Sequence, residues 1–238
     1  MYRDRLVVDT FLKTYLEKIE VLRKQIKTVK YFCEAQKSIL DIHSKTHSSV
    51  TSDSKEPTFF DCLVDDLNQD DYSVMPTETD ETIAWHIWHI ARIEDIVGNI
   101  LILNQNQLFN DEYASLMKVD VSDTGNAWSD NEIITFSKEV NIAQLLNYRR
   151  DVGAKTRETI ASLKQEDMSK KATSESLDRL LTEGCLTQDS SSFALKGFWG
   201  RLTIGGMLLL PLTRHHMMHL PDSYTIKFYC KGNAYKEK

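Results

Sequence analysis

Apolar residues recur at helical spacing through most of the chain. Over residues 5–43, apolar side chains alternate with Lys, Glu and Arg at intervals of three and four, which predicts a long amphipathic helix. Residues 44–57 (SKTHSSVTSDSKEP) are polar and without periodicity, so we expect a mobile loop there.

The second predicted helix spans residues 80–103. Pro76 and the acidic and polar run 77–81 form a helix start signal. The helix is apolar almost all round, which is typical of a central helix in a bundle. Residues 104–124 look irregular, and a capping box at residues 129–132 opens a short helix.

Two further long helices follow. One is predicted over 142–163, and the other runs from about Phe193 or Phe198 to His219, with Pro221 just past its end. A shorter helix over 174–183 is closed by Gly184. The pattern therefore predicts an all-α four-helix bundle with long crossover connections and short extra helices. We expect one domain over 1–238, with 223–238 as a C-terminal tail.

Composition and charge exclude some functions. The chain has 238 residues, 41% of them hydrophobic, and this content is typical of a globular protein. A formal net charge of −6 argues against a nucleic-acid binder, which needs a concentrated basic surface. The basic run 23–30 is better explained as the solvated face of a helix.

The cysteines and the apolar runs indicate a cytoplasmic protein. Four cysteines are scattered without a C-x-x-C pair, so we expect free thiols. The N-terminus lacks the apolar region of a signal peptide. The longest apolar run, 204–212, is broken by Gly and Pro before it reaches membrane-spanning length.

Five of the seven histidines fall in two clusters, WHIWH (85–89) and HHMMH (215–219). His215 and His219 are four residues apart, which places both imidazoles on one face of a helix. A third nitrogen from the first cluster would complete a three-histidine site with an open position, as catalytic zinc sites have. His86 and His89 lie on adjacent faces, and spacing alone leaves open which one contributes. The alternative is that they are ordinary core histidines.

The remaining candidates are weaker. His43 and His47 are also four apart, but they flank a polar segment, and we expect them at the surface. His216 lies about 100° from His215 around the helix and is poorly placed to share its metal. Pro211, one turn before His215, should kink the helix and so orient the turn that carries His215. Acids that could orient a ligand are Glu94, Asp95 and Asp222, although Glu94 is not on the face of His89.

Two segments resemble the DinB/YfiT-like family. Residues 82–95 (TIAWHIWHIARIED) look like its second-helix signature, and 212–219 (LTRHHMMH) resemble its H-x-x-x-H element. The likeness covers about 63–220. Carried over, it implies metal ligands at His89, His215 and His219 and leaves His86 an auxiliary role. The family's Gly-Gln pair is replaced by residues 220–222 (LPD), so no role is carried over beyond the last histidine.

The resemblance also implies a function. Members are four-helix bundles, often homodimers, that bind nickel, zinc or a similar divalent ion. They include S-transferases that use thiols such as bacillithiol or glutathione, and a maleylpyruvate isomerase. The expectation is therefore a metal-dependent enzyme with thiol S-transferase or hydrolase chemistry, acting on a small-molecule substrate through metal-bound water or thiol. The alternative is a non-catalytic metal-binding or stress-related bundle, or an interaction protein.

The sequence leaves the reacting partners open. No cysteine lies near either histidine cluster, so a thiol would come from a low-molecular-weight cosubstrate. Arg92, Arg201 and Arg214 could each anchor a substrate carboxylate, because arginine forms bidentate pairs. Surface salt bridges are an equal alternative for each of them.

Overall fold

The computed structural model describes residues 5–52 and 54–232. These residues are mostly helical, with no strand among them and one isolated bridge between Lys171 and Thr203. The all-α prediction is confirmed. In chain order the helices are α1 (Arg5–Gln25), η1 (Val29–Tyr31), α2 (Phe32–Thr46), α3 (Ser49–Ser52), α4 (Phe59–Val64), η2 (Asp70–Ser73), α5 (Ile83–Asp95), η3 (Ile96–Ile102), α6 (Asp111–Met117), α7 (Asp130–Glu139), α8 (Ile142–Ser162), η4 (Gln165–Ser169), α9 (Ser174–Thr182), α10 (Ser190–Arg201), α11 (Ile204–Leu209), η5 (Leu210–Arg214) and α12 (His216–Cys230).

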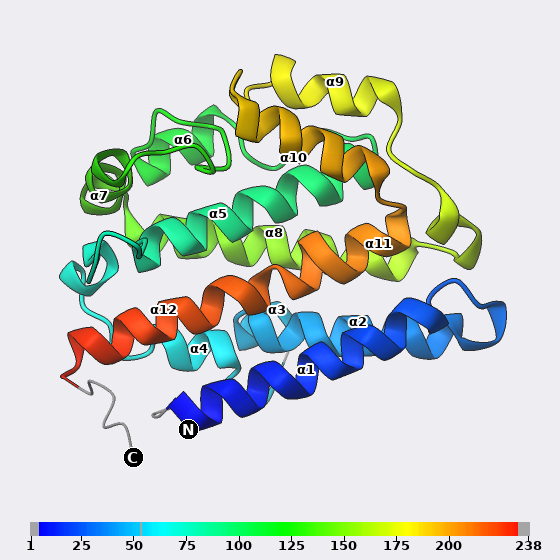
Figure 1. Cartoon of the computed structure of the whole chain (residues 1–238), viewed down its shortest axis with the longest axis horizontal. Coiled ribbons are helices and arrows are strands. Elements are labelled where there is room, and N and C mark those ends of the chain that lie inside the picture. The colour runs from blue at the N-terminus through cyan, green and yellow to red at the C-terminus, as the bar shows by residue number, and fades with distance from the viewer. Residues whose placement is uncertain (1–4, 53, 233–238) are drawn as a thin grey trace.

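Helix α5 is the central element of the fold. Every residue of α5 is buried, as its apolar sequence predicts. It packs against α8 and α12, α8 also contacts α2, and α1 packs against both α2 and α12. These contacts close a ring of long helices around the core, with α9 and α10 on the outer side next to η3 (Figure 1).

The N-terminal segment differs from its prediction as one continuous helix. α1 ends at Gln25, and after a turn α2 starts at Phe32 and packs back against α1. Val29, at the corner, is 76% exposed. Apolar residues at helical spacing continue through the turn, so the pattern cannot distinguish one straight helix from two packed helices.

The described part of the segment 44–57 contains more helix than its composition predicts. α2 extends to Thr46, and α3 forms within the segment expected to be a loop. α3 packs against α8 and α2. Thr58 then opens α4 with a capping box.

The prediction of one last helix from Phe193 or Phe198 to His219 is wrong. The segment is divided into α10, α11, η5 and α12, and the last of these does not end at His219. α12 continues through Pro221 to Cys230, because tertiary contacts on its last turns outweigh the missing backbone bond. Tyr224 and Phe228 are buried in the core. Lys227 Nζ donates to the carbonyls of Cys62 and Leu63 at 2.6 and 3.0 Å, at the C-terminal end of α4. Residues 223–230 are thus helical, and the rest of the expected tail from 233 onward lies outside the described residues.

Several local signals in the sequence are confirmed. Ser129 forms the expected capping box, and Gly184 adopts a positive φ of 68° after α9. Pro211 lies in a π-helical turn, η5, that separates α11 from α12. A search of the described helices finds none with the length and apolar character needed to span a membrane.

Candidate metal site

His89 is held in one tautomer by a neighbouring loop. Its ring is buried, and Nδ1 lies 2.7 Å from the carbonyl oxygen of Thr124. Because a carbonyl only accepts, Nδ1 carries the proton and Nε2 keeps its lone pair. Trp85 stacks on the ring at 4.5 Å, and its Nε1 donates to the Gly125 carbonyl at 3.1 Å. The loop therefore orients His89.

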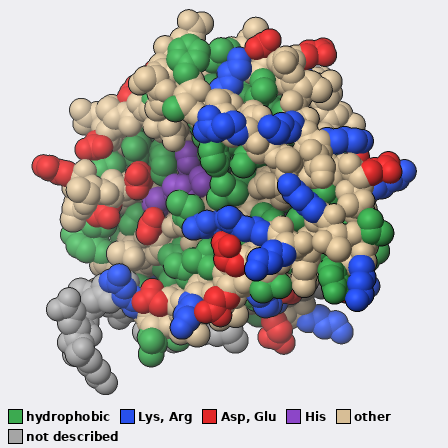
Figure 2. All heavy atoms as spheres, turned by 45° about the vertical axis from the view of Figure 1, so that its right-hand side comes forward, with side chains coloured by type: hydrophobic (Ala, Val, Ile, Leu, Met, Phe, Trp, Pro, Cys, Tyr) green, Lys and Arg blue, Asp and Glu red, His purple; other side chains and the backbone are tan. Residues whose placement is uncertain are grey.

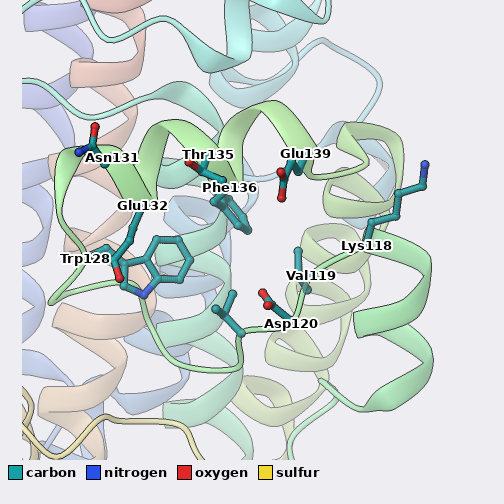
Figure 3. Close-up of a pocket in the computed structure, with 10 residues that line it drawn as sticks. Lys118, Val119, Asp120, Trp128, Asn131, Glu132, Thr135, Phe136 and Glu139 are labelled. Carbon is teal, nitrogen blue, oxygen red and sulfur yellow. The ribbon is translucent and has the colours of Figure 1, made fainter.

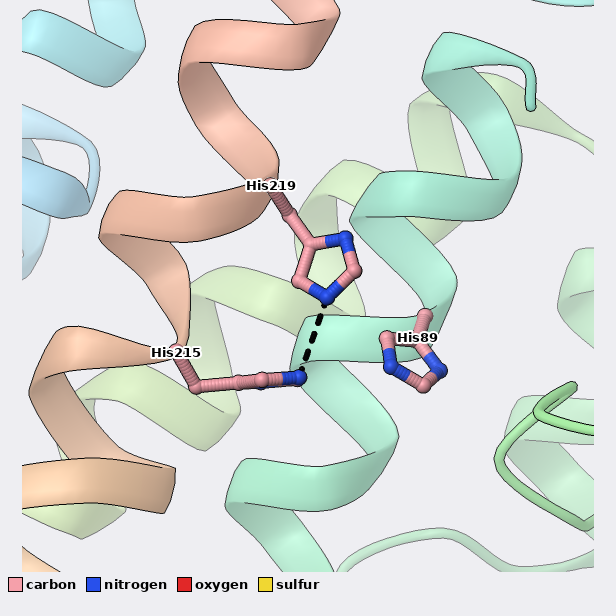
Figure 4. A group of neighbouring side chains, drawn as sticks. All are labelled: His89, His215 and His219. Atoms are coloured by element: carbon pink, nitrogen blue, oxygen red, sulfur yellow. Dashed lines mark hydrogen bonds between the residues drawn. The ribbon is translucent and has the colours of Figure 1, made fainter. Parts of the chain in front are cut away.

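His215 and His219 meet His89 from the facing helix. Their Nε2 atoms are 3.1 Å apart (Figure 4). The donor atoms of all three histidines lie within 4.8 Å of one another, and the group could hold a metal ion. Nitrogen ligands that share a tetrahedral ion at 2.0–2.1 Å are roughly 3.3 Å apart. The residues present thus fit a divalent ion.

His86 lies beside this group without joining it. Its Nδ1 is 3.0 Å from His219 Nδ1, and its Nε2 is 3.8 Å from a carboxylate oxygen of Glu81. If His219 Nε2 faces an ion, its Nδ1 carries the proton and donates to His86. His86 is then protonated at Nε2, which faces Glu81. This arrangement is that of an outer partner that fixes the tautomer of a ligand.

The three-histidine group reaches solvent on one side. His215 and His219 are partly exposed, whereas the other histidines are buried. Figure 2 shows histidine side chains in a hollow bordered by hydrophobic and charged residues. Burial raises the pKa of Glu81 and of Asp222, and the charge of Asp222 adds to the effect on Glu81. Of these two acids, Glu81 is the one that contacts a histidine, at 3.8 Å from His86 Nε2.

Glu94 builds a second group on the same central helix. Its two oxygens each lie 2.8 Å from an imidazole nitrogen, Nε2 of His43 and Nε2 of His47, and all three side chains are fully buried. The expected surface position of His43 and His47 is therefore wrong, because the polar segment around them folds into α2 and α3. This group could also hold a metal ion. The i,i+4 spacing of His43 and His47 is the sequence signal that indicates this group.

Charge around Glu94 is shared among several groups. Burial alone would raise the pKa of Glu94, but its histidine partners outweigh this and hold it well below its usual range. Burial lowers the pKa of Arg149 to about 10, and its guanidinium lies 4.0 Å from Glu94. His216 Nε2 lies 3.4 Å from Glu94, so His216 faces this second group and not the first.

The three candidate arginines occupy different environments. Arg92 is fully buried, donates to Asp95 at 3.1 Å and to the Tyr148 hydroxyl at 2.7 Å, and is a core residue, so it is neither a substrate anchor nor a surface ion pair. Arg201 is exposed at the end of α10. Arg214 precedes His215 and is partly buried, and its Nε has no hydrogen-bond partner. Arg214 is the candidate that adjoins the three-histidine group.

Neither the thiols nor the pocket at α7 coincides with the histidines. All four cysteines are free, as expected, and burial raises the pKa of Cys185 to about 11. A pocket of about 410 Å³ lies along α7, where Trp128 and Phe136 line it together with acidic side chains (Figure 3). None of its lining residues belongs to either histidine group.

Replacing Gly125 with alanine should disturb the loop that orients His89. Gly125 has a φ of +73°, and an added Cβ would lie 2.8 Å from Trp85 Nε1. We expect a loss of about 1–3 kcal/mol in the free energy of unfolding, measured by urea denaturation. Gly232→Ala is the matched control, because Gly232 also has a positive φ but no atom of the described residues lies within 4 Å of the added Cβ. Equal losses in both variants would contradict the role of the Trp85 contact.

The metal-free protein should lose stability in mild acid. Burial is the main cause that lowers the pKa of His86 to about 3 and of His89 to about 4. The unfolded chain binds protons below pH 6.5 and the folded chain does not, so stability falls as pH falls from 6.5 towards these values. Each such histidine should lower the free energy of unfolding by about 1.4 kcal/mol per pH unit. Urea denaturation at pH 7.5, 6.5 and 5.5 on metal-stripped protein tests this, and a flat profile would contradict it.

Fold and site together define an all-helical protein with a three-histidine group that could bind a metal between two facing helices. A family model described as the DinB superfamily matches residues 60–221, more than half of the chain. The chain therefore belongs to the DinB superfamily. No match is found among curated proteins.

Proposed function

We propose that this protein is a divalent-metal-dependent enzyme whose ion is held by the Nε2 atoms of His89, His215 and His219. The observation that supports this most directly is the convergence of these three donors, with His215 and His219, at the start of α12 and within it, partly exposed to solvent. Three protein ligands with an accessible side are typical of catalytic metal sites, whereas structural sites are closed by a fourth ligand.

The chemistry follows from the accessible side. A divalent ion held there, such as nickel or zinc, would act as a Lewis acid and would lower the pKa of a thiol or a water molecule to near neutrality. His86 positions His219 through the contact between their Nδ1 atoms. Glu81 faces His86 Nε2 at 3.8 Å and helps to keep the proton of His86 on that nitrogen, so that His86 Nδ1 can accept from His219. Arg214 is proposed to bind an anionic group of the substrate.

The reaction class is thiol S-transfer or hydrolysis of a small-molecule substrate. None of the protein's own thiols belongs to the histidine group, which supports a low-molecular-weight thiol as cosubstrate. Three further parts of the proposal rest on the sequence. The homodimer rests on the family resemblance, the cytoplasmic location on the scattered cysteines and the absence of a signal-peptide pattern, and the absence of a nucleic-acid partner on the net charge.

Metal content and turnover, measured on the same preparations, test the proposal. Purified wild type is compared with His89→Ala, His215→Ala and His219→Ala by elemental analysis and with a panel of thiols, electrophiles and activated esters. We expect each variant to hold one ion fewer per chain than wild type and to lose turnover. Equal metal in all four preparations would exclude the site. Metal binding in wild type with no turnover across the panel would favour the alternative, a non-catalytic metal-binding bundle.

A further inference from the structure

We infer a second metal site, formed by His43, His47 and Glu94, that takes a divalent ion such as zinc or ferrous iron. It is separate from the three-histidine group. Glu94 follows His89 by five residues on α5, which is about 7.5 Å along a helix axis. Ions that act jointly in two-metal sites are about 3.5–4 Å apart. Ions at the two groups would therefore bind independently.

The donor atoms already lie at ligand spacing. Each Glu94 oxygen is 2.8 Å from one imidazole Nε2, and the group's donors fall within 4.8 Å of one another. Adjacent ligands at right angles around an ion, each about 2.0–2.1 Å from it, are roughly 2.9 Å apart. Two histidines with one carboxylate form a known ligand set for zinc and for non-haem iron.

The contacts of His47 favour a bound cation. Its Nε2 faces a Glu94 oxygen at 2.8 Å, and its Nδ1 faces the carbonyl oxygen of His43 at 3.0 Å. Both of these oxygens are acceptors, but a neutral imidazole has only one N–H to donate. The Thr46 hydroxyl also lies 3.5 Å from Nδ1, but it donates its hydrogen to the His43 carbonyl at 3.1 Å. With the proton on Nδ1, the Nε2 lone pair faces the carboxylate. A metal ion bound by both the nitrogen and the carboxylate would remove the repulsion between the lone pair and the negative charge.

Neighbouring residues are arranged around the same point. His216 Nε2 is buried, has no hydrogen-bond partner in the described part of the chain and lies 3.4 Å from Glu94, so it could supply a fourth donor. Gly153 on α8 has no side chain where the His47 ring packs, and an added Cβ there would collide with that ring. Helix α8 therefore leaves room for His47 only with glycine at this position.

The competing occupant of this site is a proton. Arg149 lies 4.0 Å from Glu94 and donates through Nη2 to the Thr46 carbonyl at 2.7 Å, so its charge can balance the carboxylate without a metal. In that case an additional proton at His47 would satisfy both of its contacts. The two occupants differ in one measurable quantity, the number of ions bound per chain.

Zinc titration of metal-stripped full-length protein tests the inference. We expect two equivalents in wild type, one in His89→Ala/His215→Ala, one in Glu94→Gln, and none when all three changes are combined. Glu158→Gln, the same chemical change at an exposed side chain, should still bind two. Cobalt substitution should give different visible spectra for Glu94→Gln and for His89→Ala/His215→Ala, because their ligand sets differ.

The outcomes separate this inference from the proposed function. Wild type with one equivalent, and His89→Ala/His215→Ala with none, would overturn the second site and leave the first intact. If wild type and His89→Ala/His215→Ala each bind one equivalent, the three-histidine group binds no ion. That result would overturn the proposed function and leave the second site intact. If Glu94→Gln does not fold, as judged by circular dichroism, the count in His89→Ala/His215→Ala decides, because its Glu94 group is unchanged. Gly153→Ala should also lose one equivalent.

Discussion

Replacing His219 with alanine should lower the affinity for zinc by about 100-fold or more. His219 contributes a donor 3.1 Å from that of His215, and removing it leaves two imidazoles to hold the ion. Loss of an outer partner of a ligand already costs about 10–100-fold, so loss of a ligand should cost at least the upper end of that range. Competition against a chelator of known affinity measures the change.

His86→Gln provides the graded comparison. His86 contacts His219 through Nδ1 but does not belong to the three-histidine group. We expect an affinity loss of about 10–100-fold, smaller than that of His219→Ala, because only the orientation of the ligand is affected. A larger loss in His86→Gln than in His219→Ala would mean that His86 is the ligand and His219 its partner.

Replacing Asp95 with alanine should lower the free energy of unfolding by about 3–5 kcal/mol. The Asp95 carboxylate is fully buried and accepts from the Arg92 guanidinium, the Tyr148 hydroxyl and the Asn99 amide, at 3.1, 2.7 and 2.8 Å. It also accepts from two backbone N–H groups after η3, those of residues 108 and 109. Its removal leaves a buried cation without its counter-ion. Urea denaturation measures the loss.

Asp151→Ala is the matched control for this effect. Asp151 also accepts from a tyrosine hydroxyl, that of Tyr113 at 2.8 Å, and pairs with Arg150 at 3.1 Å, but this pair is about 40% exposed. Exposed ion pairs contribute about 0–1 kcal/mol. Similar losses in the two variants would contradict the claim that burial makes the Asp95 network stabilising.

The sequence predicts those parts of the site that depend on one helix. The i,i+4 spacing of His215 and His219 places both on one face, and the structure brings their Nε2 atoms together. Choosing between His86 and His89 requires knowing how α5 is rotated about its axis relative to α12. The spacing of residues along the sequence does not determine this rotation. The family resemblance pointed to His89, and the structure places His89 in the group with His86 beside it.

The second histidine group depends on packing between distant segments. Polar neighbours suggested that His43 and His47 lie at the surface, yet both are buried against Glu94, about fifty positions further along the chain. The Glu94 carboxylate provides hydrogen-bond partners for both buried rings. The local composition around the histidines gives no indication of a partner so far along the chain. The end of α12 is mispredicted for the same reason. Pro221 predicts that the helix ends, but contacts between Lys227 and α4, which lies far away in the sequence, stabilise the helical turns after it.

Anomalous diffraction from crystals of zinc-loaded protein tests the central claim most directly. The account predicts a zinc peak between α5 and α12, about 2.0–2.1 Å from the Nε2 atoms of His89, His215 and His219, with one side open to solvent. The contradicting result is no peak there at saturating zinc, with the Nε2 atoms of His215 and His219 hydrogen-bonded to each other.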